Sequence, residues 1–446
     1  MYPGHVGVMI GLSGSKTRAA ASRRNGGPSA VPRRELTRAA LAMAAHNLYV
    51  FNFCPAGFPS GLSTTKAMTS PLSFLGPAIE LIGKKASVLP ATGGAFEEMA
   101  RPDVEEADDR FFGSKQDAQG GFEDFAETPL PDWRDLYRPT PAIYRPDKHV
   151  FRYFCDGSIK TYFLGTVLEN DRSYPLELTQ IGSSIVHRKD DGSLQVAKFE
   201  RQILLLVPYA GGTGISQSLL EELRNLENPF FKVVDVEVPD PLSDRRQDPR
   251  DKSGAKARFQ MHVLEKQLID EFAPRRGSEE WTILDGGVRK GAFVELPRTI
   301  GVAKSFDRTP TFTVRKGNKG TIRKDISRLL AGLEFGHRTV AFFAHGAKVA
   351  FWYVRLRQQG EVDYPLMGVV KVEMPTPDQK PIPADLADLL SSALVGERNV
   401  TPHGLDRRWH AHLYPIFQAE RVIKANFFTE TVLLASIRWP RRQPEP

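Results

Sequence analysis

Four consecutive aromatic and β-branched runs, all between His149 and Tyr209, constrain the fold of this chain more than any other feature. Each run has the length of a strand, and turn-forming residues separate it from the next. After Tyr209, helical and strand patterns alternate almost to the end of the 446-residue chain. Consecutive strands followed by alternating helices and strands predict an α/β or α+β domain. We expect this domain to cover residues 145–440.

Five helices are predicted within this domain, one of them at Thr321–Gly336, where the pattern ends at a glycine. The clearest pattern lies at Ala255–Ala273, where apolar residues recur on one side. Ser216 has the position of an N-cap before a shorter apolar pattern. The stretches 383–394 and 415–437 predict the two closing helices.

The N-terminal part of the chain differs from the rest in composition. Residues 1–95 predict a low-order basic extension, because they are rich in Gly, Ser, Pro and Ala, with one helical pattern at Arg34–Ala45. The first 79 residues hold eight Lys or Arg and one acid, and so account for the whole formal net charge of +7. The first 34 residues resemble a transit peptide in composition, but we favour a disordered basic tail or an overlong start. Residues 96–144 predict an acidic, Pro-rich linker and an extended arm.

Cysteine usage and hydropathy narrow the class of protein. The two cysteines, Cys54 and Cys155, exclude a disulfide framework and a Cys-rich zinc site. We therefore expect a reducing, cytoplasmic setting. No run of about 18 apolar residues occurs, so the sequence predicts no membrane span. The residues after position 79 carry no formal net charge, so the folded domain must attract any polyanion through a local patch.

Two Asp-Gly pairs follow strand-like runs, at Asp156-Gly157 and at Asp285-Gly286. In each pair we expect the aspartate near the end of a strand, where the glycine lets the backbone turn. For either aspartate alone, an ordinary hairpin turn is the favoured interpretation. Two carboxylates delivered by neighbouring strands would, however, suit a hard divalent metal. Glu265 is the natural third ligand, because it lies in mid-helix beside the apolar stripe, where an unpaired charge is costly.

The order of these motifs resembles the NurA family of nucleases, which have a Piwi-like, RNase H-type fold. The resemblance covers about residues 145–440 and depends on a succession of short motifs, namely Asp156, Glu265, "LDGG" at Asp285, and "GVAKSF" with Lys304. It implies an RNase H-like mixed sheet flanked by helices. It also implies that Asp156, Glu265 and Asp285 bind catalytic Mn²⁺ or Mg²⁺, with Lys304 near the scissile phosphate.

The closing helix departs from the family pattern. The family has a helix that begins with Pro and carries Ala-His, whereas this sequence has Ala419-Glu420 in "YPIFQAERVIK". Glu420 could bind a metal through oxygen as a fourth ligand, but it could not act as an imidazole ligand. His410 and His412 lie just upstream and could swing in, although we expect loop or surface positions for both.

The resemblance implies a metal-dependent DNA nuclease that forms a homodimer and works with a HerA-type hexameric ATPase, in DNA end processing or defence. The chain has no Walker A motif, so translocation would require such a partner. One alternative is a catalytically decayed nucleic-acid-binding or scaffold protein on the same fold, which Glu420 favours. Another is a different RNase H-like enzyme, such as a recombinase or an Argonaute-like protein, although the low-order N-terminal region leaves no room for the further domains of an Argonaute.

Two further stretches carry weaker signals. The Gly-rich stretch Tyr209–Ser216 precedes a helix but lacks the Gly-Lys-Ser/Thr of a phosphate-binding loop, so we interpret it as a strand-to-helix connection. The basic stretch Thr313–Lys324 predicts a solvated loop, which could also guide a nucleic-acid backbone.

Overall fold

The computed structural model describes residues in the larger of the chain's two units. These units are Met1–Met68 and Thr69–Pro446. The described residues are 72–91, 97–98, 125–144, 149–169, 172–210, 213–237, 249–288, 293–306, 311–315, 320–344, 346–360, 363, 365–401, 409–437 and 439–440. The helix predicted at Arg34–Ala45 and the transit-like first 34 residues lie outside them.

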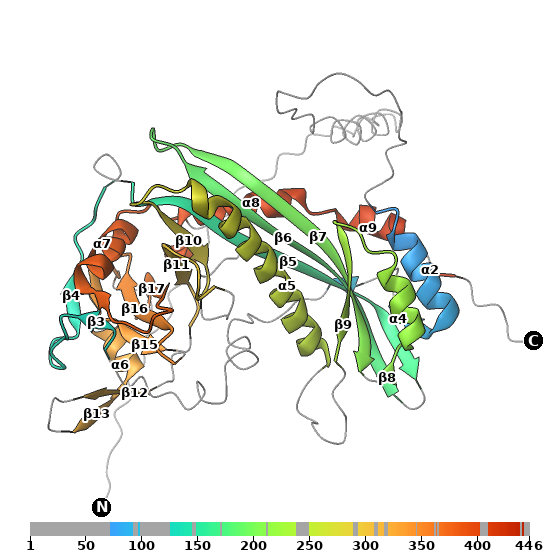
Figure 1. Ribbon diagram of the computed structural model, residues 1–446, viewed down its shortest axis with the longest axis horizontal. Helices are drawn as coiled ribbons and strands as arrows, with labels where there is room; N and C mark the ends of the chain where they lie inside the picture. The colour runs from blue at the N-terminus through green and yellow to red at the C-terminus, as the bar shows by residue number, and fades with distance from the viewer. Residues whose placement is uncertain are drawn as a thin grey trace, which may run out of the picture. The chain divides into compact units, whose positions relative to one another are not determined.

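A 14-stranded mixed sheet forms the centre of the fold (Figure 1). Along its main path the strands are, in order, β4 (Tyr137–Pro139), β14 (His337–Thr339), β16 (Val349–Arg355), β17 (Val369–Pro375), β11 (Thr299–Ala303), β10 (Trp281–Asp285), β5 (Phe151–Glu169), β6 (Arg172–Arg188), β7 (Leu194–Ala210) and β8 (Thr213–Gly214). Beside this path, β1 (Ser87–Pro90) and β2 (Glu97–Glu98) pair with β5, β9 (Phe231–Val236) pairs with β7, and β15 (Phe342–Ala344) pairs with β16. Two small ribbons join β12 (Thr311–Arg315) to β13 (Thr321–Asp325), and β3 (Glu127–Thr128) to β18 (Ile382–Pro383).

Three long strands, β5, β6 and β7, form the antiparallel series that the sequence predicts. β6 pairs antiparallel with β5 and with β7. β10 pairs parallel with β5 on one side and with β11 on the other. The turn predicted at Asp156-Gly157 does not form, so two of the four predicted strands are one strand, β5. An α/β fold with a large mixed sheet flanked by helices is confirmed.

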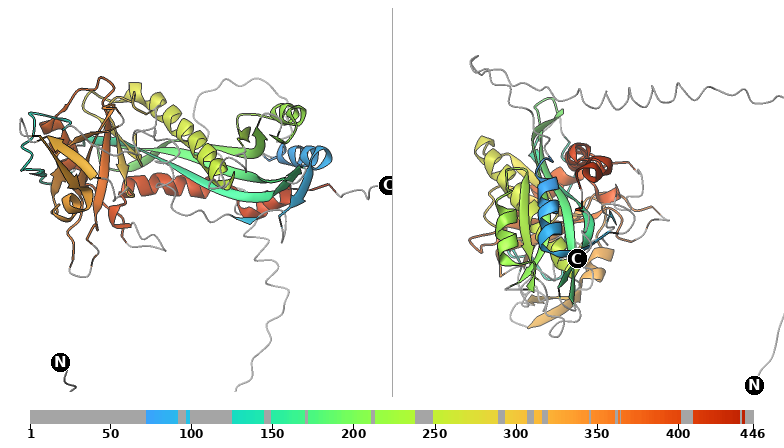
Figure 2. Two further views of the ribbon diagram at one scale, coloured as in Figure 1. Left: turned by 90° about the horizontal axis from the view of Figure 1, so that it is seen from below. Right: turned by 90° about the vertical axis from the view of Figure 1, so that its right-hand side faces the viewer.

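Helices cover both faces of this sheet (Figure 2). They are α2 (Leu75–Lys85), α4 (Gln217–Arg224), α5 (Pro249–Phe272), α6 (Ile326–Ala331), α7 (Ala384–Val395), α8 (Tyr414–Asn426) and α9 (Glu430–Ser436), with 3₁₀ turns η2 (Ala273–Arg275) and η4 (Trp409–Ala411). In the left view of Figure 2, α5 lies above the long strands and α8 below them. Met261 of α5 packs with Ile181 of β6. Ala419 of α8 packs with Phe154 of β5 on the other face. Among the described residues, no helix combines the length and the apolar character needed to cross a membrane.

The domain begins earlier in the chain than the sequence predicts. Helix α2 and strand β1 both fall inside the region predicted as low-order. Leu75, Ile79 and Ile82 of α2 are fully buried in one apolar cluster with residues of β5, β6 and β7. Their spacing is that of one helix face. The low-order prediction is therefore wrong for residues 72–91.

Part of the predicted arm also belongs to the sheet. Strand β4 pairs antiparallel with β14 at one end of the main path. Arg138 of β4 forms an ion pair with Asp388 of α7, with 2.8 Å between Nη2 and Oδ2. The pKa of Asp388 is lowered, because bonds from Arg138 and the nearby Arg338 outweigh the effect of burial. The predicted domain start at residue 145 is thus too late.

The closing helix predicted at 415–437 is two helices, since α8 ends at Asn426 and α9 begins at Glu430. Gln180 of β6 holds the connection between them. Its Nε2 donates to the Phe428 carbonyl at 3.0 Å, and its Oε1 accepts from the Phe428 amide at 2.8 Å. Both backbone groups of Phe428 are therefore satisfied outside a helix.

Candidate active site

Asp156 lies in the interior of β5 and not at a turn. Asp156 pairs with Ser184 of β6, and Gly157 pairs with Ser183, without a break in the ladder. A Cβ atom on Gly157 would lie 2.5 Å from Oε1 of Glu265, which is too close for any real side chain. The glycine therefore accommodates the close approach of α5 side chains and does not form a turn, which corrects the turn prediction at this pair.

Asp285 does occupy the predicted end of a strand. It is the last residue of β10. Gly286 follows with φ of 96°, a left-handed conformation that favours glycine. Because Leu284 pairs with Cys155 across the parallel ladder, Asp285 and Asp156 follow as neighbours on adjacent strands.

The two aspartates point to the same face of the sheet. Side chains on a strand alternate between its faces. Cys155 lies in the apolar cluster that includes α5 residues, whereas Phe154 and Ile283 lie in the cluster that includes α8 residues. Asp156 and Asp285 are each two residues beyond Phe154 and Ile283, and so face α8.

Lys304 joins the two aspartates from the end of β11. Val302 of β11 pairs with Asp285, and Lys304 lies two residues further along. Its Nζ donates to Oδ2 of Asp285 at 2.8 Å, and its side chain is only 9% exposed. A charge-assisted bond between two largely buried groups holds both side chains in place.

Electrostatic interactions link Asp156, Asp285 and Lys304 to the other two predicted residues, Glu420 and Glu265. Burial raises the pKa of Asp156 well above its ordinary value, and repulsion from Asp285, Glu420 and Glu265 raises it further, while Lys304 opposes these effects. Burial lowers the pKa of Lys304, but the carboxylates of Asp285, Asp156 and Glu420 outweigh burial and raise it. The face therefore concentrates carboxyl groups around Lys304, and these groups favour its protonated form.

Glu420 reaches this group from α8 and is less enclosed than the two aspartates. Its side chain is 26% exposed, and its Oε1 lies 2.5 Å from Nζ of Lys424. Nε2 of His412 lies 4.0 Å from its Oε2. His412 and His410 are both buried, and Nδ1 of His410 accepts from the Gly368 amide at 3.0 Å. Neither histidine is on the surface, although His412 does lie in the short loop between η4 and α8, as predicted; His410 belongs to η4.

Glu265 comes from α5, on the opposite face. It is buried, and its Oε2 lies 2.5 Å from Nδ1 of His262, one helical turn earlier. The backbone of β5 at Gly157 separates it from the side chain of Asp156. The structure thus brings together Asp156, Asp285, Lys304 and Glu420, and places Glu265 behind them. His262 was not predicted, although its i,i+3 spacing from Glu265 is the available signal.

The donor set on the α8 face fits a hard divalent cation in its chemistry. Asp156, Asp285 and Glu420 offer only carboxylate oxygens, which Mn²⁺ and Mg²⁺ prefer. Among the described residues, no three His, Cys, Asp or Glu side chains are arranged so that they could hold a metal ion. Lys304 and Lys424 now pair with Asp285 and Glu420. These two ammonium groups would compete with a metal for Oδ2 of Asp285 and Oε1 of Glu420.

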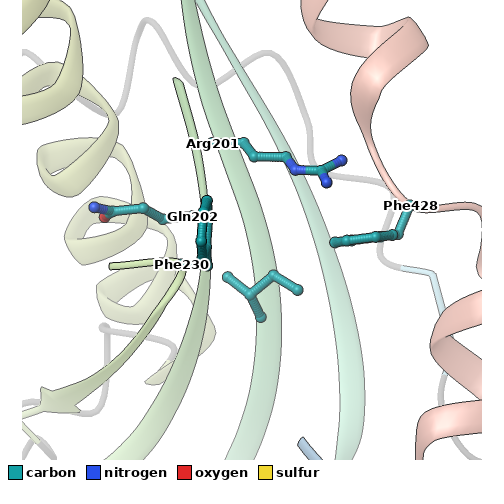
Figure 3. Close-up of a pocket in the computed structure, with 5 residues that line it drawn as sticks. Arg201, Gln202, Phe230 and Phe428 are labelled. Atoms are coloured by element: carbon teal, nitrogen blue, oxygen red, sulfur yellow. The ribbon is translucent and has the colours of Figure 1, made fainter. Parts of the chain in front are cut away.

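A small pocket lies elsewhere, where the pairing of β7 with β9 begins. Its lining residues are Arg201, Gln202, Ile203, Phe230 and Phe428 (Figure 3). Figure 3 shows Arg201 and Gln202 pointing to opposite sides of the strand. The Arg201 guanidinium lies 4.2 Å from the centroid of the Phe428 ring. None of these residues belongs to the predicted site.

The two weaker motifs have structural roles. Oγ of Ser216 accepts from the Leu219 amide at 3.3 Å and caps α4, which confirms the strand-to-helix interpretation of the Gly-rich stretch. The basic stretch forms most of the β12–β13 ribbon and not a simple loop.

Comparisons with known proteins provide no relative from which the role of this site could be inferred. No protein-family model matches the sequence, and a search of curated proteins finds no match.

Proposed function

We propose that this protein is a metal-dependent DNA nuclease with an RNase H-like fold, similar to the NurA family. The observation that carries the proposal is the pair of Asp156, which is buried, and Asp285, which is partly buried, on adjacent parallel strands, with Lys304 bonded to Asp285. Clustered buried carboxylates with a perturbed pKa are costly to a fold and concentrate at functional sites. A site of this kind suits a substrate that arrives with cations, as a nucleic acid does.

The strand order supports the finer fold assignment. In the series β7-β6-β5-β10-β11, only β6 runs against the others. In an RNase H-like sheet, three consecutive antiparallel strands come first in the chain. Two later strands then extend the sheet beside the first of the three and run parallel to it. Asp156 lies on β5 and Asp285 on β10, the adjacent parallel strands in the middle of this series.

Each residue of the α8 face has a role in the proposed reaction. Asp156, Asp285 and Glu420 would hold Mn²⁺ or Mg²⁺. When bound, the metal supplies a water of lowered pKa and stabilises charge on the phosphodiester. Lys304 would contact a phosphate oxygen once Asp285 binds the metal instead. Glu265 would support the face from behind, because its contact with Gly157 fixes β5 beside Asp156.

The proposed partners are DNA, a second copy of the chain and a HerA-type hexameric ATPase. The absence of a Walker A motif from the sequence supports the need for a separate motor.

A catalytically decayed scaffold on the same fold is the second candidate. It is favoured by the pairing of Glu420 with Lys424 and of Asp285 with Lys304, which leaves two of the three carboxylates already neutralised.

Cleavage assays separate the two candidates. Asp156→Asn and Asp285→Asn each remove a charge with almost no change in shape. We expect each to abolish Mn²⁺-dependent cleavage of single- or double-stranded DNA, tested with and without the ATPase, while DNA binding is retained. Asp378→Asn, at an exposed ion pair with Lys380, is the control and should cut like the wild type. A wild-type protein that cuts nothing in any mixture, and binds DNA no differently from the two variants, would establish the scaffold instead.

A further inference from the structure

We propose that Glu373 and Lys371 of β17 position Asp285 from the α5 face of the sheet. The inference rests on the proposed function, since it assigns the support of one proposed metal ligand. Neither residue touches the α8 face, so both would act through the backbone that carries Asp285.

The turn after Asp285 folds back over β11. The turn can lie this close to β11 because residue 301 is a glycine. A Cβ atom on Gly301 would lie 2.4 Å from the carbonyl oxygen of Gly286 and 3.1 Å from the Val288 amide nitrogen. No other residue type fits beneath a backbone so close. Residues 286–288 therefore lie across β11 and reach the next strand, β17.

Glu373 fastens this turn. It pairs with Gly301 across the antiparallel ladder and is 2% exposed. Its Oε2 accepts from the Val288 amide at 3.0 Å. A Cβ atom on Gly287 would lie 2.7 Å from the same oxygen, so the backbone of the turn packs directly against the Glu373 carboxylate. An ionised acceptor makes this bond stronger than a bond between neutral groups.

Lys371 forms an ion pair with that carboxylate inside the domain. Its Nζ lies 2.7 Å from Oε1 of Glu373, and both side chains are nearly inaccessible. Its ammonium group also lies 4.8 Å from the centroid of the Phe351 ring. A buried carboxylate without such a partner would be strongly disfavoured in its charged form.

The two bonds that hold the turn also fix the backbone that follows Asp285. Gly286 donates to the Val302 carbonyl at 3.0 Å, and Val288 is fixed two residues later, so the backbone on the C-terminal side of Asp285 has two anchors. The side chain of Asp285 leaves the sheet toward Lys304 from this fixed position. Residues that orient a metal ligand from a second layer typically change metal affinity 10–100-fold when removed.

The test compares two buried glutamates in the full-length protein. Glu127 is the matched control, because it also forms a buried ion pair, with Arg338, and also accepts a backbone amide, from Ala341 at 2.9 Å. We expect Glu373→Ala and Glu127→Ala both to lower the melting temperature. Only Glu373→Ala should weaken Mn²⁺ binding, by about 10–100-fold in titration calorimetry. Glu373→Gln keeps an acceptor for Val288 and should lose less.

Hydrogen exchange gives a readout that does not depend on metal or activity. A peptide that covers 281–288 should exchange faster in Glu373→Ala than in Glu127→Ala. Equal exchange and wild-type Mn²⁺ affinity in Glu373→Ala would overturn the positioning role and leave the proposed function standing. A wild-type protein that binds no Mn²⁺ would overturn the proposed function, and this inference with it.

Discussion

Asp156 is a carboxylate that is only 4% exposed and is influenced by three other acids and by Lys304. Such a group destabilises the metal-free fold at neutral pH, because its charged form is poorly solvated and repelled by its neighbours. We therefore expect the stability of the protein to depend on what this cluster binds. This dependence gives a test that requires no substrate.

Asp156→Asn should stabilise the metal-free protein in a pH-dependent way. Burial and the neighbouring carboxylates raise the pKa of Asp156, so the folded state binds a proton more tightly than the unfolded state does. Wild-type stability therefore falls as pH rises from about 4 through the raised pKa, whereas the asparagine does not titrate. We expect the variant to be more stable at pH 7 in chelator, with the difference vanishing toward about pH 4. Urea denaturation across this range measures it, and a difference that does not change with pH contradicts the raised pKa.

Gly157→Ala should destabilise the fold although alanine is the better residue in most backbones. The added Cβ meets Oε1 of Glu265 at 2.5 Å and Sδ of Met261 at 2.7 Å, so α5 or the Glu265–His262 pair must shift. Overpacking of this kind costs about 1–3 kcal/mol of unfolding free energy. Gly277→Ala is the control, because its Cβ would make only an ordinary contact at 3.4 Å with Glu280. Equal unfolding free energies for the two variants would show that α5 yields without cost.

At the scale of elements, the break between α8 and α9 depends on one side chain of β6. Gln180→Leu keeps the approximate size but leaves the amide and carbonyl of Phe428 without their partner, at a cost of about 1–3 kcal/mol. Gln180→Glu retains an acceptor for the amide and should lose less. Unfolding free energies and hydrogen exchange of residues 426–430 measure both effects. Slow exchange retained in the leucine variant would mean that Gln180 does not hold the connection.

Local patterns in the sequence predict the elements better than they predict their connections. The long strands and α5 follow from apolar periodicity, which each segment carries by itself. The break at Phe428 and the glycine at position 157 depend on contacts with Gln180 and with α5, which no local window contains. For the site, residue types and strand patterns pointed to Asp156 and Asp285, and only the family resemblance pointed to Lys304; the fold brings the three together. The face from which Glu265 approaches depends on how α5 packs, and the sequence does not state it.

At the scale of the whole molecule, the boundary of the folded domain gives a contrast between two deletions. Removal of residues 1–68 should leave the fold intact, because every described element lies beyond them. Removal of residues 1–85 also deletes α2, whose buried Leu75, Ile79 and Ile82 cover the β5–β7 end of the sheet. We expect the first deletion to melt as the wild type does and the second to melt at a lower temperature in calorimetry. Equal melting of the two would show that α2 contributes nothing to the core.

The shorter deletion also tests where the proposed DNA affinity would arise. All eight Lys and Arg residues of the first 79 positions lie within residues 1–68. Contacts between such residues and phosphates are non-specific and weaken steeply as salt rises. The deletion should therefore weaken DNA binding at low salt and change it little at high salt, as measured by fluorescence anisotropy. A loss of equal size at all salt concentrations would place specific DNA contacts in that segment.

The order of the strands along the chain has a consequence for biosynthesis. β5, β6 and β7 follow one another and pair as two long antiparallel ladders, so a nascent chain can fold them as soon as they emerge. Asp285 and Lys304 join this meander only after α5 has been made, and Glu420 arrives close to the C-terminus. A ribosome-bound or prematurely ended chain therefore exposes Asp156 without its partners. The acidic face is completed last, so a partly synthesised chain lacks it even after its long strands have paired.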